Sequence, residues 1–208
     1  MIGIVSHVSR REQAERLALK VNADYVSEDD GTLGCEGNHR RVWEWLAATA
    51  DTWSVVLEDD ALPVDGFTYQ LEQALSVAPT PIASLYLGQG QPRQWQDRIY
   101  QAIHAAEQDN ACWIVGKRLL FGVAVCIKTD LISSMLACID TSTRPIDFAI
   151  KDWAVQAGHD ICFPTPSIVD HADGPTLITD RTDTTRDMPR TAWRIGERER
   201  WTSKQVPL

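Results

Sequence analysis

The sequence predicts an α/β protein with a mixed, mostly parallel central sheet flanked by helices on both faces. Short apolar runs alternate with segments of helical periodicity over residues 1–90, which is typical of sheets whose strands are joined by crossover helices. The chain has 208 residues, of which 44% are hydrophobic and 24% charged. It is therefore long enough for one domain with a substantial core, and its composition excludes disordered and fibrous proteins.

The first half of the chain supplies the clearest alternation. The expected elements are a strand at 1–6, a helix at 10–21, a strand at 23–27, a helix after 38 that reaches 49, a strand at 54–57, a helix at 67–78 and a strand at 82–87. Pro79 and Pro81 end the last of these helices, because proline lacks the backbone donor that a helix needs.

The second half is less regular. The expected elements are a helix at 95–103, strands at 111–115 and 121–127, helices at 131–139 and 148–157, and short strands at 161–163 and 167–169. The residues Gly116, Lys117 and Arg118 lie between two strand-like runs, so the sequence predicts a hairpin there.

Composition excludes several other classes of protein. The net charge of −9 argues against a nucleic-acid partner, because phosphate contacts need clustered Lys and Arg. No run of 18 apolar residues exists, so no membrane-spanning helix is expected. Five scattered cysteines without metal-type spacing fit small core residues in a reducing cytosol, and we expect a cytoplasmic protein. The sequence predicts no oligomeric state.

The segment 181–208 departs from the acidic average. Trp193 and Trp201 are interleaved with arginines, and rings among guanidinium groups suit a polyanionic or nucleobase-bearing acceptor. The alternative is a solvated C-terminal helix whose tryptophans pack back onto the domain, since charge-rich helices are often simply exposed faces.

The acidic cluster Glu58-Asp59-Asp60 is the most informative feature. It ends an apolar strand-like run, and buried carboxylates need a counter-ion. Alternation along the strand would send Glu58 and Asp60 to one face and Asp59 to the other. Such a pair provides two oxygen ligands for Mg²⁺ or Mn²⁺, ions that complete their shells with water and phosphate. The alternative is an acidic turn that caps the next helix.

A longer motif surrounds this cluster. Residues 34–44 read Gly-Cys-Glu-Gly-Asn-His-Arg-Arg-Val-Trp-Glu, and Leu-Glu-Asp-Asp follows at 57–60. This arrangement resembles the signature of family 25 glycosyltransferases over residues 1–87, and more loosely over 121–170. Asn38 stands where the family usually has Ser, so a hydroxyl role there would be lost. Short bacteriophage-encoded proteins look similar as well.

The resemblance implies a GT-A-like (Rossmann-like) fold and a metal-dependent, inverting sugar transfer. The donor would be a nucleotide-diphosphate sugar, with uridine as the expected nucleotide. Residues 1–180 would form a single catalytic domain, with the donor half at about 1–90 and the acceptor half at about 91–180, followed by the basic extension 181–208. The acceptor would be a saccharide or glycolipid or, in a phage protein, a hydroxymethylated DNA base or a virion protein.

Individual residues receive roles from position and resemblance together. Asp60, Glu58 and a C-terminal imidazole, His171, are the expected ligands of Mn²⁺ or Mg²⁺. The expected donor-binding residues are Ser6, His7, Arg10, His39, Glu58 and Asp59. Ser6, His7 and Arg10 follow the first strand, where open sheets bind ligands, although a capped first helix turn would explain them equally well. His39 could equally be a structural residue.

An inverting transfer also needs a carboxylate that takes the acceptor proton. Asp152 and Asp147 are the two candidates, and only one is expected to act, because five residues apart on a helix they share no face. Asp152 is favoured slightly, since the neighbouring Trp153 could stack on a sugar. Asp147 better fits an acid that simply stabilises a helix N-terminus.

Two other functions compete with glycosyl transfer. One is a non-catalytic nucleotide-sugar or carbohydrate-binding module that keeps the fold, which we expect if neither Asp147 nor Asp152 faces the metal site. The other is a nucleotidyltransferase, which shares the acidic strand end. It is disfavoured because residues 4–9 contain no glycine-rich loop to hold phosphates.

Overall fold

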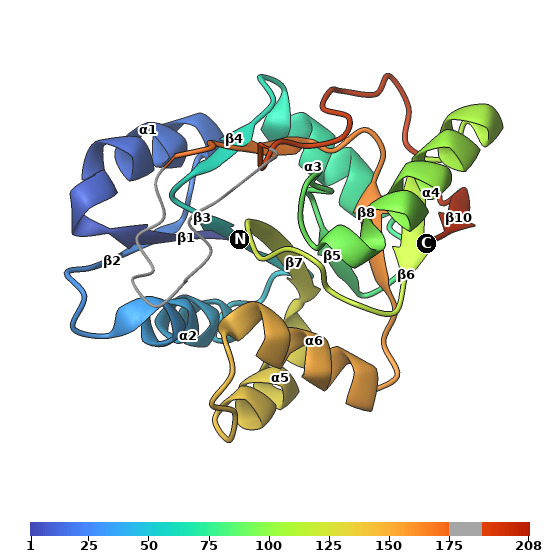
Figure 1. The fold of residues 1–208 in the computed structure, drawn as a ribbon. Helices are drawn as coiled ribbons and strands as arrows, with labels where there is room; N and C mark the ends of the chain where they lie inside the picture. Colours follow the sequence, from blue (N-terminus) through green and yellow to red (C-terminus); the bar gives the residue numbers. More distant parts are fainter. Residues whose placement is uncertain (175–188) are drawn as a thin grey trace.

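The chain folds around one eight-stranded sheet with helices on both faces (Figure 1). The computed structural model describes residues 1–174 and 189–208. The order of the strands in the sheet is β10-β6-β8-β5-β7-β3-β1-β2, and β4 and β9 form a separate two-stranded sheet. In chain order the strands are β1 (Ile2–His7), β2 (Tyr25–Asp29), β3 (Trp53–Glu58), β4 (Ala61–Pro63), β5 (Ile82–Ser84), β6 (Trp113–Gly116), β7 (Ala124–Lys128), β8 (Ile161–Pro164), β9 (Val169–His171) and β10 (Gln205–Pro207).

The large sheet is mixed. Strands β2, β1 and β3 are parallel neighbours, and the pairs β5–β8 and β6–β10 are also parallel. Strand β7 runs antiparallel to both β3 and β5, and β6 runs antiparallel to β8. Four of these seven pairings are parallel, so the predicted mixed α/β sheet is confirmed.

Six α-helices and three short 3-10 helices lie among the described residues. They are η1 (Val8–Arg10), α1 (Arg11–Val21), α2 (Gly34–Ala47), α3 (Phe67–Ser76), η2 (Arg93–Trp95), α4 (Gln96–Asp109), η3 (Thr129–Leu131), α5 (Ile132–Ile139) and α6 (Ile146–Gln156). No helix in the described ranges has the length and apolar character needed to cross a membrane.

The two faces of the sheet carry separate hydrophobic clusters. Val5 and Val56 point into one cluster with α2, α4, α5 and α6, whereas Ile4 and Leu57 point into the other with α1 and α3. Successive side chains of a strand point to opposite faces, so apolar runs without alternation belong to strands buried on both sides. This explains why the strand at 53–58 reads as one continuous apolar run before its acids.

The order in which the chain adds strands to the sheet reverses at β1. Strand β2 lies on one side of β1 and β3 on the other, and Val5 is level with Glu58 in the pairing of β1 with β3. Open α/β sheets bind ligands outside the carboxyl ends of strands at such a switch point. The fold therefore directs attention to the residues that follow β1 and β3.

Two expected strand arrangements are wrong. Strands β6 and β7 do not form a hairpin, because β8 and β5 lie between them in the sheet. Val125, Cys126 and Ile127 of β7 are all buried, and this favours an interior position between β3 and β5 over a two-stranded hairpin. The expected strand at 167–169 is displaced to β9, which pairs with β4 outside the large sheet.

The C-terminal segment contains no helix in residues 189–208, so the alternative of a solvated C-terminal helix is wrong there; residues 181–188 lie outside the described ranges. The segment instead runs along the sheet, with isolated bridges from Ala192 to Gly88 and from Ile195 to Ser167 (Figure 1). It ends as β10, beside β6. The expected packing of tryptophan is confirmed for Trp201, which is buried.

Candidate functional site at the carboxyl ends of β1 and β3

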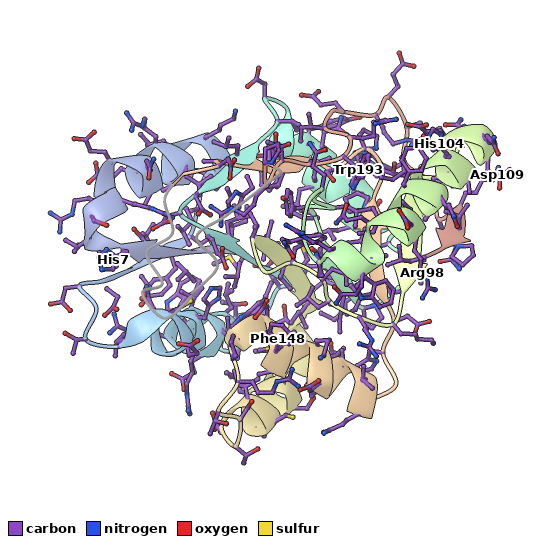
Figure 2. The ribbon with its side chains drawn as sticks, in the orientation of Figure 1. His7, Arg98, His104, Asp109, Phe148 and Trp193 are labelled. Carbon is purple, nitrogen blue, oxygen red and sulfur yellow. The ribbon has the colours of Figure 1, made fainter. Side chains whose placement is uncertain are left out.

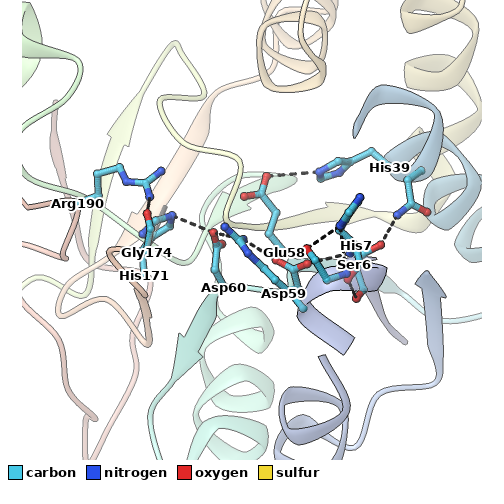
Figure 3. Close-up of polar contacts among 12 residues, drawn as sticks. Ser6, His7, His39, Glu58, Asp59, Asp60, His171, Gly174 and Arg190 are labelled. Atoms are coloured by element: carbon cyan, nitrogen blue, oxygen red, sulfur yellow. Dashed lines mark hydrogen bonds and ion pairs between the residues drawn. The ribbon is translucent and has the colours of Figure 1, made fainter. Parts of the chain in front are cut away.

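The acidic cluster Glu58-Asp59-Asp60 directly adjoins the end of β1 (Figure 3). The backbone N–H of His7 donates to Asp59 Oδ2 at 2.9 Å. The ring of His7 turns toward the following turn, with Nδ1 2.8 Å from Ser9 Oγ. We call this region the β1–β3 site: residues 6–10 and 58–60, together with His39 and His171.

Arg10 holds two of the three acids. Its Nη1 lies 2.8 Å from Asp59 Oδ1 and 2.8 Å from Asp60 Oδ2. The three side chains are only 16%, 8% and 11% exposed, so the single positive charge of Arg10 faces two carboxylates in a largely desolvated place. The expectation that Asp59 and Asp60 face opposite ways is wrong, because β3 ends at Glu58 and both aspartates belong to the turn that follows.

Glu58 turns toward a different partner, His39 of α2. His39 Nε2 lies 3.4 Å from Glu58 Oε1, and the His39 side chain is 4% exposed. Burial opposes a charge on the ring, but the adjacent Cys35 and Glu58 side chains outweigh it and raise the pKa of His39 to about 10. We therefore treat the pair as an imidazolium beside a carboxylate.

His171 reaches the cluster from the small sheet. Its position is fixed by the pairing of Ala61 with His171 and by the Ala172 N–H, which donates to the Asp60 carbonyl at 2.9 Å. His171 Nε2 then lies 3.5 Å from Asp60 Oδ2. Burial raises the pKa of the Asp60 carboxyl and lowers the pKa of His171.

Several buried polar atoms of this region make no hydrogen bond. Among the described residues, they are both ring nitrogens of His39, Nε1 of Trp43, Oδ1 of Asp60 and Nδ1 of His171. Buried polar groups in proteins are nearly always hydrogen-bonded, and exceptions call for an explanation. Their concentration around the β1–β3 site is what a polar ligand or ordered water would explain.

Asp147 lies at the same site and Asp152 does not. A small cavity of about 10 Å³, which is room for about one water molecule, is lined by Asp147, His39 and Gly122 among others. A Cβ placed on Gly122 would lie 3.2 Å from Glu58 Oε1 and 3.5 Å from Asp147 Cβ. Asp147 is thus the later carboxylate that the structure brings to the acidic cluster.

Asp152 is engaged elsewhere on α6. Its carboxylate lies 3.0 Å from Lys151 Nζ and 2.6 Å from Arg144 Nη1, and these neighbours lower the pKa of Asp152. The proposed sugar platform, Trp153, is buried and donates from Nε1 to Ser134 Oγ at 3.1 Å. The reason for preferring Asp152 is therefore wrong.

Ser6 and Asn38 contact the backbone at the ends of the strands that carry the site. The Ser6 hydroxyl is buried and lies 3.4 Å from the His7 carbonyl. The Asn38 amide donates to the carbonyls of Ser6 and Ser27 at 2.9 and 3.1 Å and accepts from the Ser27 hydroxyl. Asn38 thus joins the ends of β1 and β2, which gives this departure from the family motif a structural role. Donor binding by Ser6 stays a prediction.

Arg190 belongs beside the site, although sequence reasoning placed it only in the basic extension. It donates from Nη2 to the Gly174 carbonyl at 2.9 Å (Figure 3). Its own carbonyl accepts from the Tyr86 hydroxyl at 2.7 Å. The Tyr86 ring lies 6.0 Å from the His171 ring. No local pattern in the sequence signals this, because the approach depends on the path of the C-terminal segment.

The expected metal ligands do not form a metal site as they are arranged. Within the described ranges, no group of three or more His, Cys, Asp or Glu side chains could hold a metal ion. Glu58 faces His39, and Arg10 lies against Asp59 and Asp60. One atom would suit a cation, the buried and unpaired Asp60 Oδ1. The dependence on Mn²⁺ or Mg²⁺ stays a prediction.

Trp193, Arg194 and Arg198 of the C-terminal segment are used in packing. Trp193 Nε1 donates to Gln96 Oε1 at 2.8 Å, and Arg194 Nε lies 2.6 Å from Glu107 Oε1. Arg198 donates to two backbone carbonyls and to Asn110. Figure 2 shows Trp193 beside α4, far from His7. The segment therefore lends no support to a DNA acceptor.

These observations define an open-sheet α/β protein with charge-paired side chains at its switch point. The sequence matches no protein-family model, and no curated protein matches it. Among solved structures it is similar to the inositol-1-phosphate CTP transferase from T. maritima, with 11% identity and a TM-score of 0.39, over 77% of this chain and 64% of that one. The chain thus spans about two thirds of that protein. The likeness is too distant to bear on activity.

Proposed function

We propose that this protein is a glycosyltransferase that moves a sugar from a nucleotide-diphosphate sugar to an acceptor hydroxyl. The observation that carries the proposal is the meeting of Arg10, Asp59 and Asp60 at the carboxyl ends of β1 and β3. A ligand is expected at that switch point. The resemblance of residues 34–60 to family 25 glycosyltransferases names its class, with a uridine nucleotide as the expected carrier.

The chemistry requires two kinds of group. The acceptor oxygen attacks the anomeric carbon while the bond from that carbon to the diphosphate oxygen breaks, and the bonding electrons leave with the diphosphate. Arg10 is suited to the negative charge that develops there, because guanidinium groups bind phosphate through paired hydrogen bonds. The acceptor proton passes to a carboxylate, for which we propose Asp147 in place of Asp152.

The position of Asp147 also favours an enzyme over a binding module. A module that only holds a nucleotide sugar needs no second carboxylate near the acidic cluster. Asp147 shares the surroundings of Gly122 with Glu58 and lines the same small cavity as His39. Substrate turnover, and not binding alone, is therefore the expected outcome.

A thermal-shift panel tests the proposed function. UDP-, GDP- and ADP-sugars are added with and without Mn²⁺, with uridine as a control that lacks phosphate. A ligand at 100 times its Kd stabilises the folded state by about 2.7 kcal/mol, which raises Tm by about 5 °C or more in a chain of this size. If no nucleotide sugar raises Tm under either condition, the proposal is wrong.

A further inference from the structure

Arg10 occupies the place at the acidic cluster where a metal ion would be expected. We infer that Arg10 is the resident cation of Asp59 and Asp60, and that it keeps divalent metal ions out until an anionic ligand draws the guanidinium away. The second half of this inference rests on the proposed function, because the anion would be the diphosphate of the donor. The first half concerns the free protein alone.

The contacts support the exclusion of a second cation. One guanidinium nitrogen, Nη1, bridges Asp59 Oδ1 and Asp60 Oδ2 at 2.8 Å each, and all three side chains are at most 16% exposed. An arginine cannot lose its proton in a protein, so its charge is permanent. A divalent ion bound to the same oxygens would meet this charge at close range and with little solvent screening.

The acidic cluster nevertheless contains one acceptor atom that is not hydrogen-bonded. Asp60 Oδ1 is buried and makes no hydrogen bond, although Oδ2 of the same carboxylate is paired. Next to it His171, 5% exposed, has a ring nitrogen, Nδ1, that also lacks a partner. Two unsatisfied buried atoms on adjacent side chains are costly unless water, an ion or another state of the protein uses them. Once Arg10 has moved, Asp60 could offer both of its carboxylate oxygens to a cation.

An anion bound near the start of α1 would give the Arg10 guanidinium an alternative partner. Arg10 ends η1, the short 3-10 helix between β1 and α1, and the N-terminus of α1 has no side-chain cap. Backbone N–H groups at the start of a helix bind phosphate, and arginine adds paired hydrogen bonds to such an anion. A diphosphate at the end of β1 would therefore compete with Asp59 and Asp60 for the guanidinium. Metal and nucleotide would then bind cooperatively through Arg10.

The test measures Mn²⁺ binding to the free protein by electron paramagnetic resonance, with no nucleotide present. We expect Arg10→Gln to bind Mn²⁺ at least tenfold more tightly than the unaltered protein, because the excluding charge is gone. Arg10→Lys keeps the charge and should bind Mn²⁺ as weakly as the unaltered protein. Arg16→Gln is the matched control, since Arg16 lies on α1 with its side chain 72% exposed.

Unchanged or weaker Mn²⁺ binding in Arg10→Gln overturns the inference. If that variant does not fold, the unaltered protein decides: UDP should raise its affinity for Mn²⁺ at least tenfold, and independent binding of the two ligands contradicts Arg10 as the link. The outcomes stay distinct from a failure of the proposed function. Tighter Mn²⁺ binding in Arg10→Gln without any binding of UDP would sustain the exclusion and refute the glycosyltransferase.

Discussion

The β1–β3 site and the C-terminal segment 189–208 both contain arginine and ring-bearing side chains, but they differ in how completely their buried polar atoms are hydrogen-bonded. In the C-terminal segment Trp201 Nε1 donates to Gln70 at 2.7 Å, and Arg198 donates to three acceptors. In the β1–β3 site Asp60 and His171 each keep a buried atom without a hydrogen bond.

The difference separates stabilising from ligand-binding residues. A fully bonded buried group contributes to the folded state and has no capacity left for a ligand. An unsatisfied group weakens the folded state and keeps that capacity. The C-terminal segment should therefore matter for stability, and the β1–β3 site for binding and turnover. The predictions below test this division, from the largest effect to the smallest.

Asp60→Asn should produce the largest effect. The substitution keeps the shape of the side chain but removes the charge shared by Arg10 and His171. We expect turnover to fall about 1,000-fold, equivalent to about 4 kcal/mol, measured as release of nucleoside diphosphate from the donor. Asp65→Asn is the control, because Asp65 is 99% exposed in its pair with Lys20. Equal activity in both variants would show that Asp60 has no role in turnover.

Trp201→Ala should affect stability alone. Trp201 is 7% exposed, packs against Trp113 at a ring distance of 5.6 Å and bonds to Gln70. Removing a buried tryptophan side chain costs about 3–4 kcal/mol of unfolding free energy, measurable by urea denaturation. The affinity for UDP, measured where the variant is folded, should not change. A loss of UDP affinity in the folded variant would contradict the division between the two regions.

The control for Trp201 lies in the same segment. Ile195 is 45% exposed, so Ile195→Ala should change the unfolding free energy by less than about 0.5 kcal/mol. A large loss of stability in this variant would show that the whole segment, and not the buried Trp201, supplies the stabilisation.

Asp147→Asn and Asp152→Asn test which of the two carboxylates of α6 acts as the base. Asp147 lies with Glu58 around Gly122, whereas Asp152 pairs with Arg144 and Lys151. We expect Asp147→Asn to lower turnover about 100-fold, or about 2.7 kcal/mol, with little change in donor affinity. Asp152→Asn should turn over normally. Full activity in both variants would leave the reaction without its proposed base.

Much of the fold could be predicted from the sequence, because it depends on local periodicity. The strand at 54–57 and the helices at 10–21 and 67–78 follow from apolar spacing and proline stops. Partner choice did not follow, since β6 and β7 look like neighbours along the chain yet lie two strands apart. Pairing in a sheet is decided by burial on both faces, which a local pattern does not encode.

The site followed the same rule. The acidic cluster could be predicted because a charged strand end is visible in one stretch of sequence, and His39 because it lies within the motif at 34–44. The choice of Asp147 over Asp152 required knowing which turn of α6 faces Gly122. Arg190 could not be predicted, because its approach to the site depends on where the C-terminal segment crosses the sheet.

Counted per pH unit, the smallest predicted effect is a pH dependence that arises at the β1–β3 site. The pKa of His39 is about 10 in the folded protein, against about 6.5 when unfolded, so the folded state holds a proton that the unfolded state releases. Stability from this group is complete below about pH 6.5 and is lost as pH rises toward 10, by at most about 1.4 kcal/mol per pH unit.

Urea denaturation between about pH 7 and pH 8 measures this slope in the unaltered protein and in His39→Gln, because burial raises the pKa of Cys126 and Cys162 and these thiols would add a slope of their own at higher pH. The variant should lose the slope, because glutamine does not titrate. His104→Gln is the control, since His104 is 43% exposed, and it should keep the slope. The arginines of segment 189–208 hold their protons throughout this range and contribute nothing to it. A slope that survives in His39→Gln would mean that the imidazolium pair with Glu58 is not formed.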